Sequence, residues 1–197
     1  NASNAENMGN LANAIKSNAP DYQVLTLDWS SAANQGPNET SSLRQSTPWI
    51  QPVARTALDM INNDLEISRD NLNLIGHSLG TYVSWEIANQ LNQGVPRIIA
   101  LDPATQIPLG PYRTDNIDFS SVSDSSWGFY GAEEDTASYG SDVKTQTAQE
   151  SFKLNFAGDT SASEAHGGVI DAFANILELK ASNDLFTSAD LFITETF

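Results

Sequence analysis

The feature that most limits how this chain can fold is a change of hydrophobic period within residues 71–91, NLNLIGHSLGTYVSWEIANQL. Residues 72–75 form a short apolar run that is typical of a buried strand. Beyond Ser78 the apolar residues recur at every fourth position, which is the spacing of one helix face. That face consists of Leu79, Val83, Ile87 and Leu91. The segment therefore predicts a strand, a tight turn and a helix, which is ended by Gly94 and Pro96.

The turn in this segment has the spacing Gly-x-Ser-x-Gly, from Gly76 to Gly80, with Ser78 in the middle. Between a strand and a helix, this spacing is typical of a nucleophile elbow, in which a strained backbone presents the serine hydroxyl. We expect both glycines to be needed because larger side chains would collide at the turn. An ordinary serine in a glycine-bounded turn is the alternative, and the flanking strand and helix argue against it.

The rest of the chain alternates between strand-like and helix-like segments. Strands are expected at 22–29, 72–75 and 97–101, with weaker ones at 117–122 and 152–156. Helices are expected around 8–15, 53–65, 79–91 and 170–177, and a surface loop at 30–48. This alternation predicts an α/β fold with a mostly parallel sheet and helices on both faces. Residues 183–197 are expected to form an edge strand or the start of a further segment.

Composition limits the partners that the protein can have. The 197 residues are enough for one good core, so a single domain is expected. The net charge of -16 disfavours nucleic acid and anionic lipid headgroups. The absence of cysteine excludes disulfides and a cysteine-ligated zinc site. No apolar run is long enough to span a membrane, and residues 1–10 do not resemble a signal peptide, so an export signal would already have been removed.

A serine nucleophile needs a base to accept its proton, and the chain has only two histidines. His77 is adjacent to Ser78, and neighbouring side chains in a tight turn point apart, so its expected role is packing beside the turn. His166 follows the strand expected at 152–156, in a loop expected at the carboxyl edge of the sheet. By elimination His166 is the candidate base, with an ordinary solvent-exposed histidine as the alternative.

The base in turn needs a buried carboxylate that fixes its tautomer and stabilises its cation. Asp102 ends the strand expected at 97–101, the next strand along the chain from the elbow. Asp124 ends the strand expected at 117–122 and is a credible rival. The residues alone do not separate these two candidates.

The sequence IGHSLG followed by IIALDPA resembles the pancreatic-lipase-like family of α/β hydrolases. That family includes lipoprotein lipase, phospholipase A1 enzymes and non-catalytic yolk proteins, which lack the serine that this chain keeps. The family places its acid after the LDPA strand, at the spacing from the serine seen here. The resemblance therefore implies Asp102 rather than Asp124, and a triad with Ser78 and His166. It runs from about residue 8 to 180.

The chain departs from the family pattern in three ways. The family's histidine lies in Cys-x-His-x-Arg-Ser, whereas SEAHGG surrounds His166. The family's disulfides are absent, which suggests a distant bacterial-type relative. In this fold an earlier strand ending in His-Gly supplies one oxyanion-hole N–H, and this sequence begins after that point. We therefore expect an N-terminally incomplete α/β-hydrolase domain over residues 1–182, completed by an upstream segment, with the Leu79 N–H as one oxyanion donor.

The resemblance also implies a structural calcium. In the family a calcium site follows the LDPA strand, and PYRTDNID places Asp115 and Asn116 near its ligand pair. Oxygen ligands of this kind suit calcium. Solvated side chains in an acidic protein are the alternative.

Residues 125–150 contain several aromatic side chains between the last weak strands. They include Trp127, Phe129, Tyr130 and Tyr139. These residues are expected to form the wall of an acyl pocket, a short lid or an ordinary part of the core.

Together these features predict a serine esterase or lipase that hydrolyses the carboxylic ester bonds of a lipid or small ester substrate through an acyl-enzyme. No cofactor is expected for the chemistry, and the protein is expected to be secreted. A non-catalytic lipid- or partner-binding module with a vestigial triad is the alternative. An acyltransferase or a peptidase on the same fold is a third reading.

Overall fold

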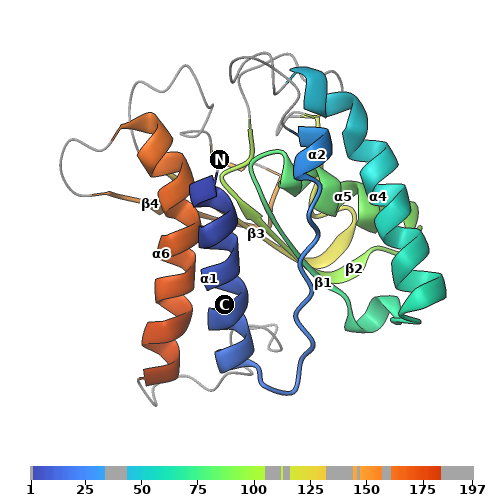
Figure 1. Cartoon of the computed structure of the whole chain (residues 1–197), viewed down its shortest axis with the longest axis horizontal. Helices are drawn as coiled ribbons and strands as arrows, with labels where there is room; N and C mark the ends of the chain where they lie inside the picture. Colours follow the sequence, from blue (N-terminus) through green and yellow to red (C-terminus); the bar gives the residue numbers. More distant parts are fainter. Residues whose placement is uncertain are drawn as a thin grey trace. The chain divides into compact units, whose positions relative to one another are not determined.

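The computed structural model describes residues 2–33, 44–104, 112, 116–131, 144–145, 147–156 and 161–182 (Figure 1). The described residues form two compact units. One unit takes its residues from 28–166, and the other takes them from 1–27 and from the region after 166. The predicted domain boundary at residue 182 lies at the end of the described chain, and residues 183–197 lie outside it.

The unit of residues 28–166 is built on four parallel strands in sequence order. They are β1 (Asn73–His77), β2 (Val95–Leu101), β3 (Ser123–Gly131) and β4 (Glu150–Leu154). Parallel strands put all their carboxyl ends at one edge of the sheet. The predicted α/β fold with a mostly parallel sheet is confirmed, and the architecture agrees with an α/β hydrolase.

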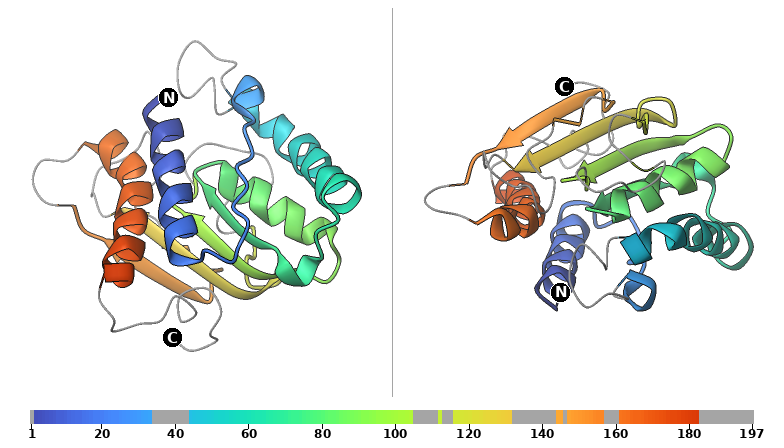
Figure 2. Two further views of the ribbon diagram at one scale, coloured as in Figure 1. Left: turned by 60° about the horizontal axis from the view of Figure 1, so that its bottom comes forward. Right: turned by 90° about the horizontal axis from the view of Figure 1, so that it is seen from above.

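Two helices cover this sheet in two layers, and both were predicted from apolar residues at every fourth position. Helix α5 (Gly80–Gln90) contacts β1 and β2, and α4 (Ile50–Asp59) packs on α5, as Figure 2 shows. Helix α4 continues as a π-helical turn, η2 (Met60–Asp64). Apolar side chains from these elements form the core, among them Ile50, Ala54, Leu58, Val83, Ile87 and Ile98. Burial of this apolar surface is what fixes the helices on the sheet.

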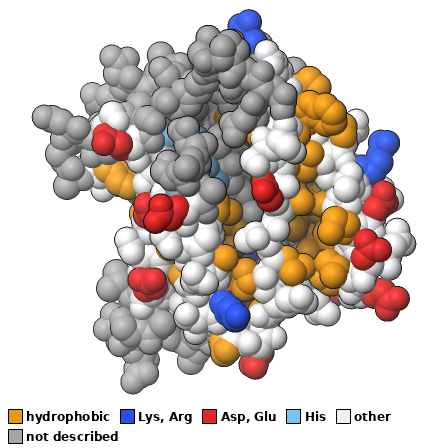
Figure 3. Space-filling view, in the orientation of Figure 1, with side chains coloured by type: hydrophobic (Ala, Val, Ile, Leu, Met, Phe, Trp, Pro, Cys, Tyr) orange, Lys and Arg blue, Asp and Glu red, His pale blue; other side chains and the backbone are white. Residues whose placement is uncertain are grey.

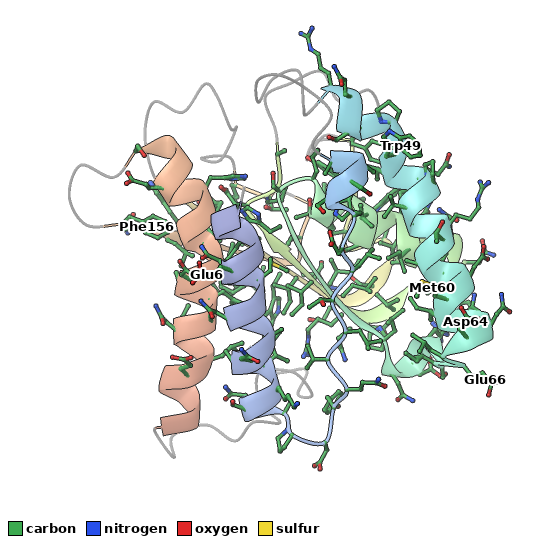
Figure 4. The ribbon with its side chains drawn as sticks, in the orientation of Figure 1. Glu6, Trp49, Met60, Asp64, Glu66 and Phe156 are labelled. Carbon is green, nitrogen blue, oxygen red and sulfur yellow. The ribbon has the colours of Figure 1, made fainter. Side chains whose placement is uncertain are left out.

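The outer side of α4 and η2 keeps several large apolar side chains exposed. Trp49, Met60 and Leu65 are among them. Figure 4 shows Trp49 near the start of α4 and Met60 near its other end, and Figure 3 shows hydrophobic side chains on this side of the molecule. The face of α4 that carries Ala54 and Leu58 is buried, and α4 packs on α5.

Short helical pieces complete this unit. They are α2 (Ser30–Ala33), η1 (Thr47–Trp49) and η3 (Arg69–Asn71). Residues 44–46 are helical as well. The surface loop predicted at 30–48 is therefore partly helical, and residues 34–43 lie outside the described chain.

The second unit contains α1 (Ala2–Asn18) and most of α6 (Ala162–Ser182), whose first residues belong to the sheet unit. The two helices lie side by side, and the Asn7 amide donates a 3.0 Å hydrogen bond to the Asp171 carboxylate. Leu11 of α1 and Phe173 of α6 are buried. The helices predicted at 8–15 and 170–177 are thus confirmed, and both are longer than predicted.

The strand predicted at 117–122 is wrong. Residues 118–121 form a turn in which the Asp118 carboxylate accepts hydrogen bonds from the backbone N–H groups of Ser120 and Ser121, at 3.0 and 3.2 Å. Side-chain acceptors of this kind favour turns over strands. The strand begins instead at Ser123, and its central residues from Ser126 to Phe129 are buried.

The strand predicted at 22–29 is also wrong. The described chain has no strand before β1, and the segment before α2 is extended without a ladder partner. Leu25 and Leu27 are 51% and 46% exposed. The apolar run has the composition of a strand, but a strand is stable only when a neighbour accepts its hydrogen bonds.

Candidate active site

The elbow between β1 and α5 is built as the sequence predicts. Ser78 has a φ of 54°, in the left-handed region that side-chain-bearing residues seldom adopt. Its N–H donates to the Leu101 carbonyl at 3.0 Å, and its own carbonyl accepts from the Thr81 hydroxyl at 2.7 Å. These bonds hold the strained residue between strand and helix.

The two glycines of the elbow have different roles. A Cβ added to Gly76 would lie 2.4 Å from the Gly80 carbonyl oxygen, closer than real contacts allow. A Cβ added to Gly80 would meet no described atom within 4 Å. The collision predicted for both positions therefore exists only at Gly76, where the first turn of α5 approaches β1.

Asp102 lies at the carboxyl end of β2, next to the elbow. Register pairs His77 with Leu101, so Ser78 and Asp102 each follow the last paired residue of a neighbouring strand. Asp102 also has a positive φ, 45°, and its N–H donates to the Phe129 carbonyl at 2.7 Å. Its carboxylate is buried, and Oδ1 lies 3.5 Å from the Gly131 N–H.

His166 lies in the second turn of α6, so the predicted loop position is wrong. A capping box begins this helix. The Ser161 N–H donates to the Glu164 carboxylate at 2.9 Å, and the Glu164 N–H points back to the Ser161 hydroxyl at 3.4 Å. The spacing Ser-x-x-Glu is legible in the sequence and is the signal that places the helix start ahead of His166.

The structure brings His166 and Asp102 into direct contact. Nδ1 of His166 lies 2.6 Å from Oδ2 of Asp102, and both side chains are buried. A carboxylate accepts here, so Nδ1 carries the proton and the lone pair of the neutral ring is on Nε2. This is the tautomer that a general base requires.

Electrostatics at this pair act in opposite directions. Burial lowers the pKa of the His166 imidazole to about 4, from an ordinary value of 6.5. The Asp102 carboxylate favours the imidazolium and limits that effect. The net shift is downward, so the ring is neutral at pH 7 and able to accept a proton.

Asp124, the rival acid, lies near the start of β3. It is the second residue of β3 and is exposed. Since β3 is parallel to β2 and pairs Val95 with Ser123, Asp124 lies toward the amino edge of the sheet. Asp124 is therefore separated from the edge of the sheet that carries Ser78 and Asp102. The sequence predicted that a strand ends just before Asp124, whereas β3 begins at Ser123.

The remaining predicted residues have mixed outcomes. Leu79 is the N-cap of α5, so its N–H belongs to the first helical turn, where N–H groups have no partner within the helix. Asn116 is exposed in a turn, and Asp115 lies outside the described residues. In the described part of the chain, no three His, Cys, Asp or Glu side chains are grouped as a metal site.

The aromatic segment is part of the sheet where it is described. Trp127 and Phe129 are buried on β3, and Phe129 stacks on Phe152 of β4 with ring centres 5.0 Å apart. Tyr130 also lies on β3, and Tyr139 lies outside the described residues. Trp127 and Phe129 are therefore core aromatics of a central strand.

His77 makes a contact that sequence reasoning missed. Its Nε2 lies 2.8 Å from the backbone carbonyl oxygen of His166, and the two imidazole centres are 4.5 Å apart. The two residues are distant in sequence, so local patterns carry no signal for this contact.

Across the described residues, none of the helices combines the length and apolarity needed to cross a membrane.

Comparison with known proteins identifies a family match. The Lipase family model matches residues 2–118. A phospholipase A1 of Vespula maculifrons is 32% identical over 111 residues, which are 50% of this chain and 36% of that protein. The pancreatic triacylglycerol lipase of Ictidomys tridecemlineatus is 28% identical over 96 residues, 48% of this chain and 20% of that lipase.

The lipoprotein lipase of Papio anubis is 31% identical over 94 residues, 48% of this chain and 19% of that enzyme. The chain thus spans between 19% and 36% of the length of these three curated relatives. All three come from animals, and they give no support to the predicted bacterial type.

Proposed function

We propose that this chain, which belongs to the lipase family, hydrolyses carboxylic ester bonds of lipids through an acyl-enzyme. The observation that carries the proposal is the 2.6 Å contact between His166 and Asp102, where Asp102 and the strained Ser78 each follow the last paired residue of neighbouring strands. A buried histidine held in the neutral, Nδ1-protonated form is able to accept a proton at Nε2, which supports its proposed role as the base.

In the proposed reaction Ser78 attacks the carbonyl carbon of the ester. His166 takes the hydroxyl proton through Nε2 as the new C–O bond forms, and returns it to the leaving alcohol. Asp102 keeps the imidazole oriented and stabilises its cation. Water then attacks the acyl-enzyme while the same Nε2 takes its proton, and Nε2 passes that proton to Oγ of Ser78 as the acid leaves.

The developing oxyanion needs donors on the other side of the carbonyl. We assign the Leu79 N–H as one of them, because it follows the nucleophile at the start of α5. The helix dipole of α5 adds a positive potential at the same end. Removal of one oxyanion donor costs on the order of 10²-fold to 10³-fold in turnover.

The proposed substrates are lipid esters, as the names of the relatives indicate for those proteins. We also propose that the protein acts outside the cell. The chemistry uses only side chains and backbone groups of the chain. A structural calcium at Asp115 and Asn116 stays a prediction, because Asp115 lies outside the described residues.

Turnover tests this proposal directly. The full-length polypeptide carrying this sequence should release nitrophenol from p-nitrophenyl butyrate and fatty acid from emulsified triacylglycerol or phospholipid. Ser78→Ala should abolish both activities, and Ser17→Ala, a change of an exposed serine on α1, should leave them unchanged. A folded protein that releases neither product would instead be a non-catalytic binding module.

A further inference from the structure

We propose that His77 is a positioning residue that holds His166 at the correct distance from the nucleophile. The proposal rests on the function proposed above and adds a role for a side chain that the reaction itself does not use. Its basis is the 2.8 Å contact from His77 Nε2 to the backbone carbonyl of His166.

The chemistry of this contact fixes the state of His77. A carbonyl oxygen can only accept a hydrogen bond, so Nε2 of His77 must carry a proton. Surrounding protein atoms and the neighbouring His166 lower the pKa of His77 to about 3, so the ring is neutral and Nδ1 is unprotonated. The two histidines therefore hold opposite tautomers, with Nε2–H on His77 and Nδ1–H on His166.

The contact gives His166 a second anchor. Its side chain is held by Asp102, which follows β2, and its backbone is held by His77, the last residue of β1. The Asp102 contact orients the ring of His166, and the His77 contact acts on its main-chain carbonyl instead. Two anchors from adjacent strands fix both the ring direction and the main-chain position.

The position of His77 in the chain makes this anchor relevant to catalysis. His77 is bonded directly to Ser78, and its backbone is paired in register with Leu101. The strand that carries the nucleophile, β1, thus also helps to fix the position of His166 relative to Ser78. A misplacement of about 1 Å between reacting groups can cost on the order of 10²-fold in rate.

Simple packing is the competing explanation for His77. The rings of His77 and His166 are tilted by 43° with centres 4.5 Å apart, so ring contact alone would stabilise the pair. His77 is partly exposed, and histidine surface is visible on the face shown in Figure 3. Packing and positioning differ in one respect, because only positioning needs the Nε2–H donor.

Two substitutions separate these explanations. His77→Phe keeps an aromatic ring and removes the donor, whereas His77→Gln removes the ring and offers an amide N–H at a similar reach. We expect His77→Phe to lower kcat for p-nitrophenyl butyrate on the order of 10-fold to 10²-fold, with KM nearly unchanged. We expect His77→Gln to recover most of that loss. Equal losses in the two variants, or an unchanged kcat in His77→Phe, would overturn the proposal.

Nuclear magnetic resonance of protein labelled with ¹⁵N-histidine tests the same point without turnover. Wild-type protein should show the Nε2–H tautomer for His77 and a downfield Nδ1–H proton for His166. His77→Phe should broaden or shift that proton by loosening the His166 backbone. An Nδ1–H tautomer for His77, or an unaltered His166 signal in a folded His77→Phe variant, would contradict the inference. Because this readout does not need catalysis, an inactive wild-type protein would overturn the proposed function alone.

Discussion

Two aspartates on neighbouring strands show what makes a carboxylate useful at this site. Asp102 follows the end of β2, is buried, and contacts His166 through Oδ2. Asp124 lies at the start of β3 and is exposed to solvent. The strands are parallel, so a strand's end and its neighbour's start lie at opposite edges of the sheet. Position along the strand, and not residue type or order in the chain, therefore decides which of the two acids can reach His166.

Neutralising each acid in turn should have very different effects on turnover. Asp102→Asn should lower kcat on the order of 10⁴-fold, because the amide favours the wrong tautomer of His166. Asp124→Asn should leave kcat within about twofold, because its side chain is exposed at the other edge. Steady-state hydrolysis of p-nitrophenyl butyrate measures both. A large loss in Asp124→Asn, with Asp102→Asn active, would reverse the assignment.

The sequence predicts the part of the site that is formed by consecutive residues of the chain. The strand, turn and helix around Ser78 follow one another within residues 71–91, and their periods are legible without any tertiary information. Asp102 was one of two open candidates on the residues alone, since composition does not show where a strand ends. The family resemblance favoured Asp102, and its contact with His166 agrees with that choice.

The elements that were mispredicted depend on distant partners or on capping. Residues 117–122 are apolar enough for a strand, but the Asp118 carboxylate organises a turn there. The polar residues around His166 are typical of a loop, but Ser161 and Glu164 form a capping box that begins a helix ahead of it. Residues 22–29 have a strand's composition, and no ladder in the described chain holds them. His77 was assigned to packing because its contact spans 89 residues.

The acid–base pair can be tested by pH. Burial lowers the pKa of His166 to about 4, and the ring must be neutral to act as a base. We therefore expect kcat/KM to fall as the pH drops through about 4, rather than through the ordinary value of 6.5. A pH–rate profile measures this limb. An acid limb at 6.5 or above would show that Asp102 outweighs burial at this pair.

Stability should respond to the same shift. Because the folded-state pKa of His166 is depressed, the unfolded chain binds more protons between pH 6.5 and about 4. The free energy of unfolding should therefore decrease as the pH falls through that window, by up to about 1.4 kcal/mol per pH unit for each such histidine. Denaturant unfolding at pH 7 and pH 4.5 checks the sign. A free energy of unfolding that increases over this range would contradict the burial of a neutral His166.

The two elbow glycines offer a matched pair with a smaller expected effect. Gly76→Ala forces a Cβ to within 2.4 Å of the Gly80 carbonyl, so we expect a loss of about 1–3 kcal/mol in the free energy of unfolding. Gly80→Ala meets no described atom within 4 Å at the first residue of α5, and should be neutral or slightly stabilising. Denaturant unfolding compares them, and equal losses would contradict the asymmetry of the elbow.

The smallest expected effect concerns the start of α6. Ser161→Ala removes the hydroxyl that faces Glu164, and should cost about 1 kcal/mol in the free energy of unfolding. Ser17→Ala on the exposed side of α1 is the control and should cost nothing measurable. Thermal unfolding of both variants measures the difference. An unchanged Ser161→Ala variant would mean that packing alone sets the position of this helix.

The proposed role of Ser78 as a nucleophile activated by His166 can be tested without a known substrate. The full-length polypeptide is treated with a fluorophosphonate probe, and the modified residue is mapped by mass spectrometry. We expect a single adduct at Ser78 that is absent from a folded His166→Ala variant. A folded wild-type protein that does not react, or an adduct at another serine, would contradict it.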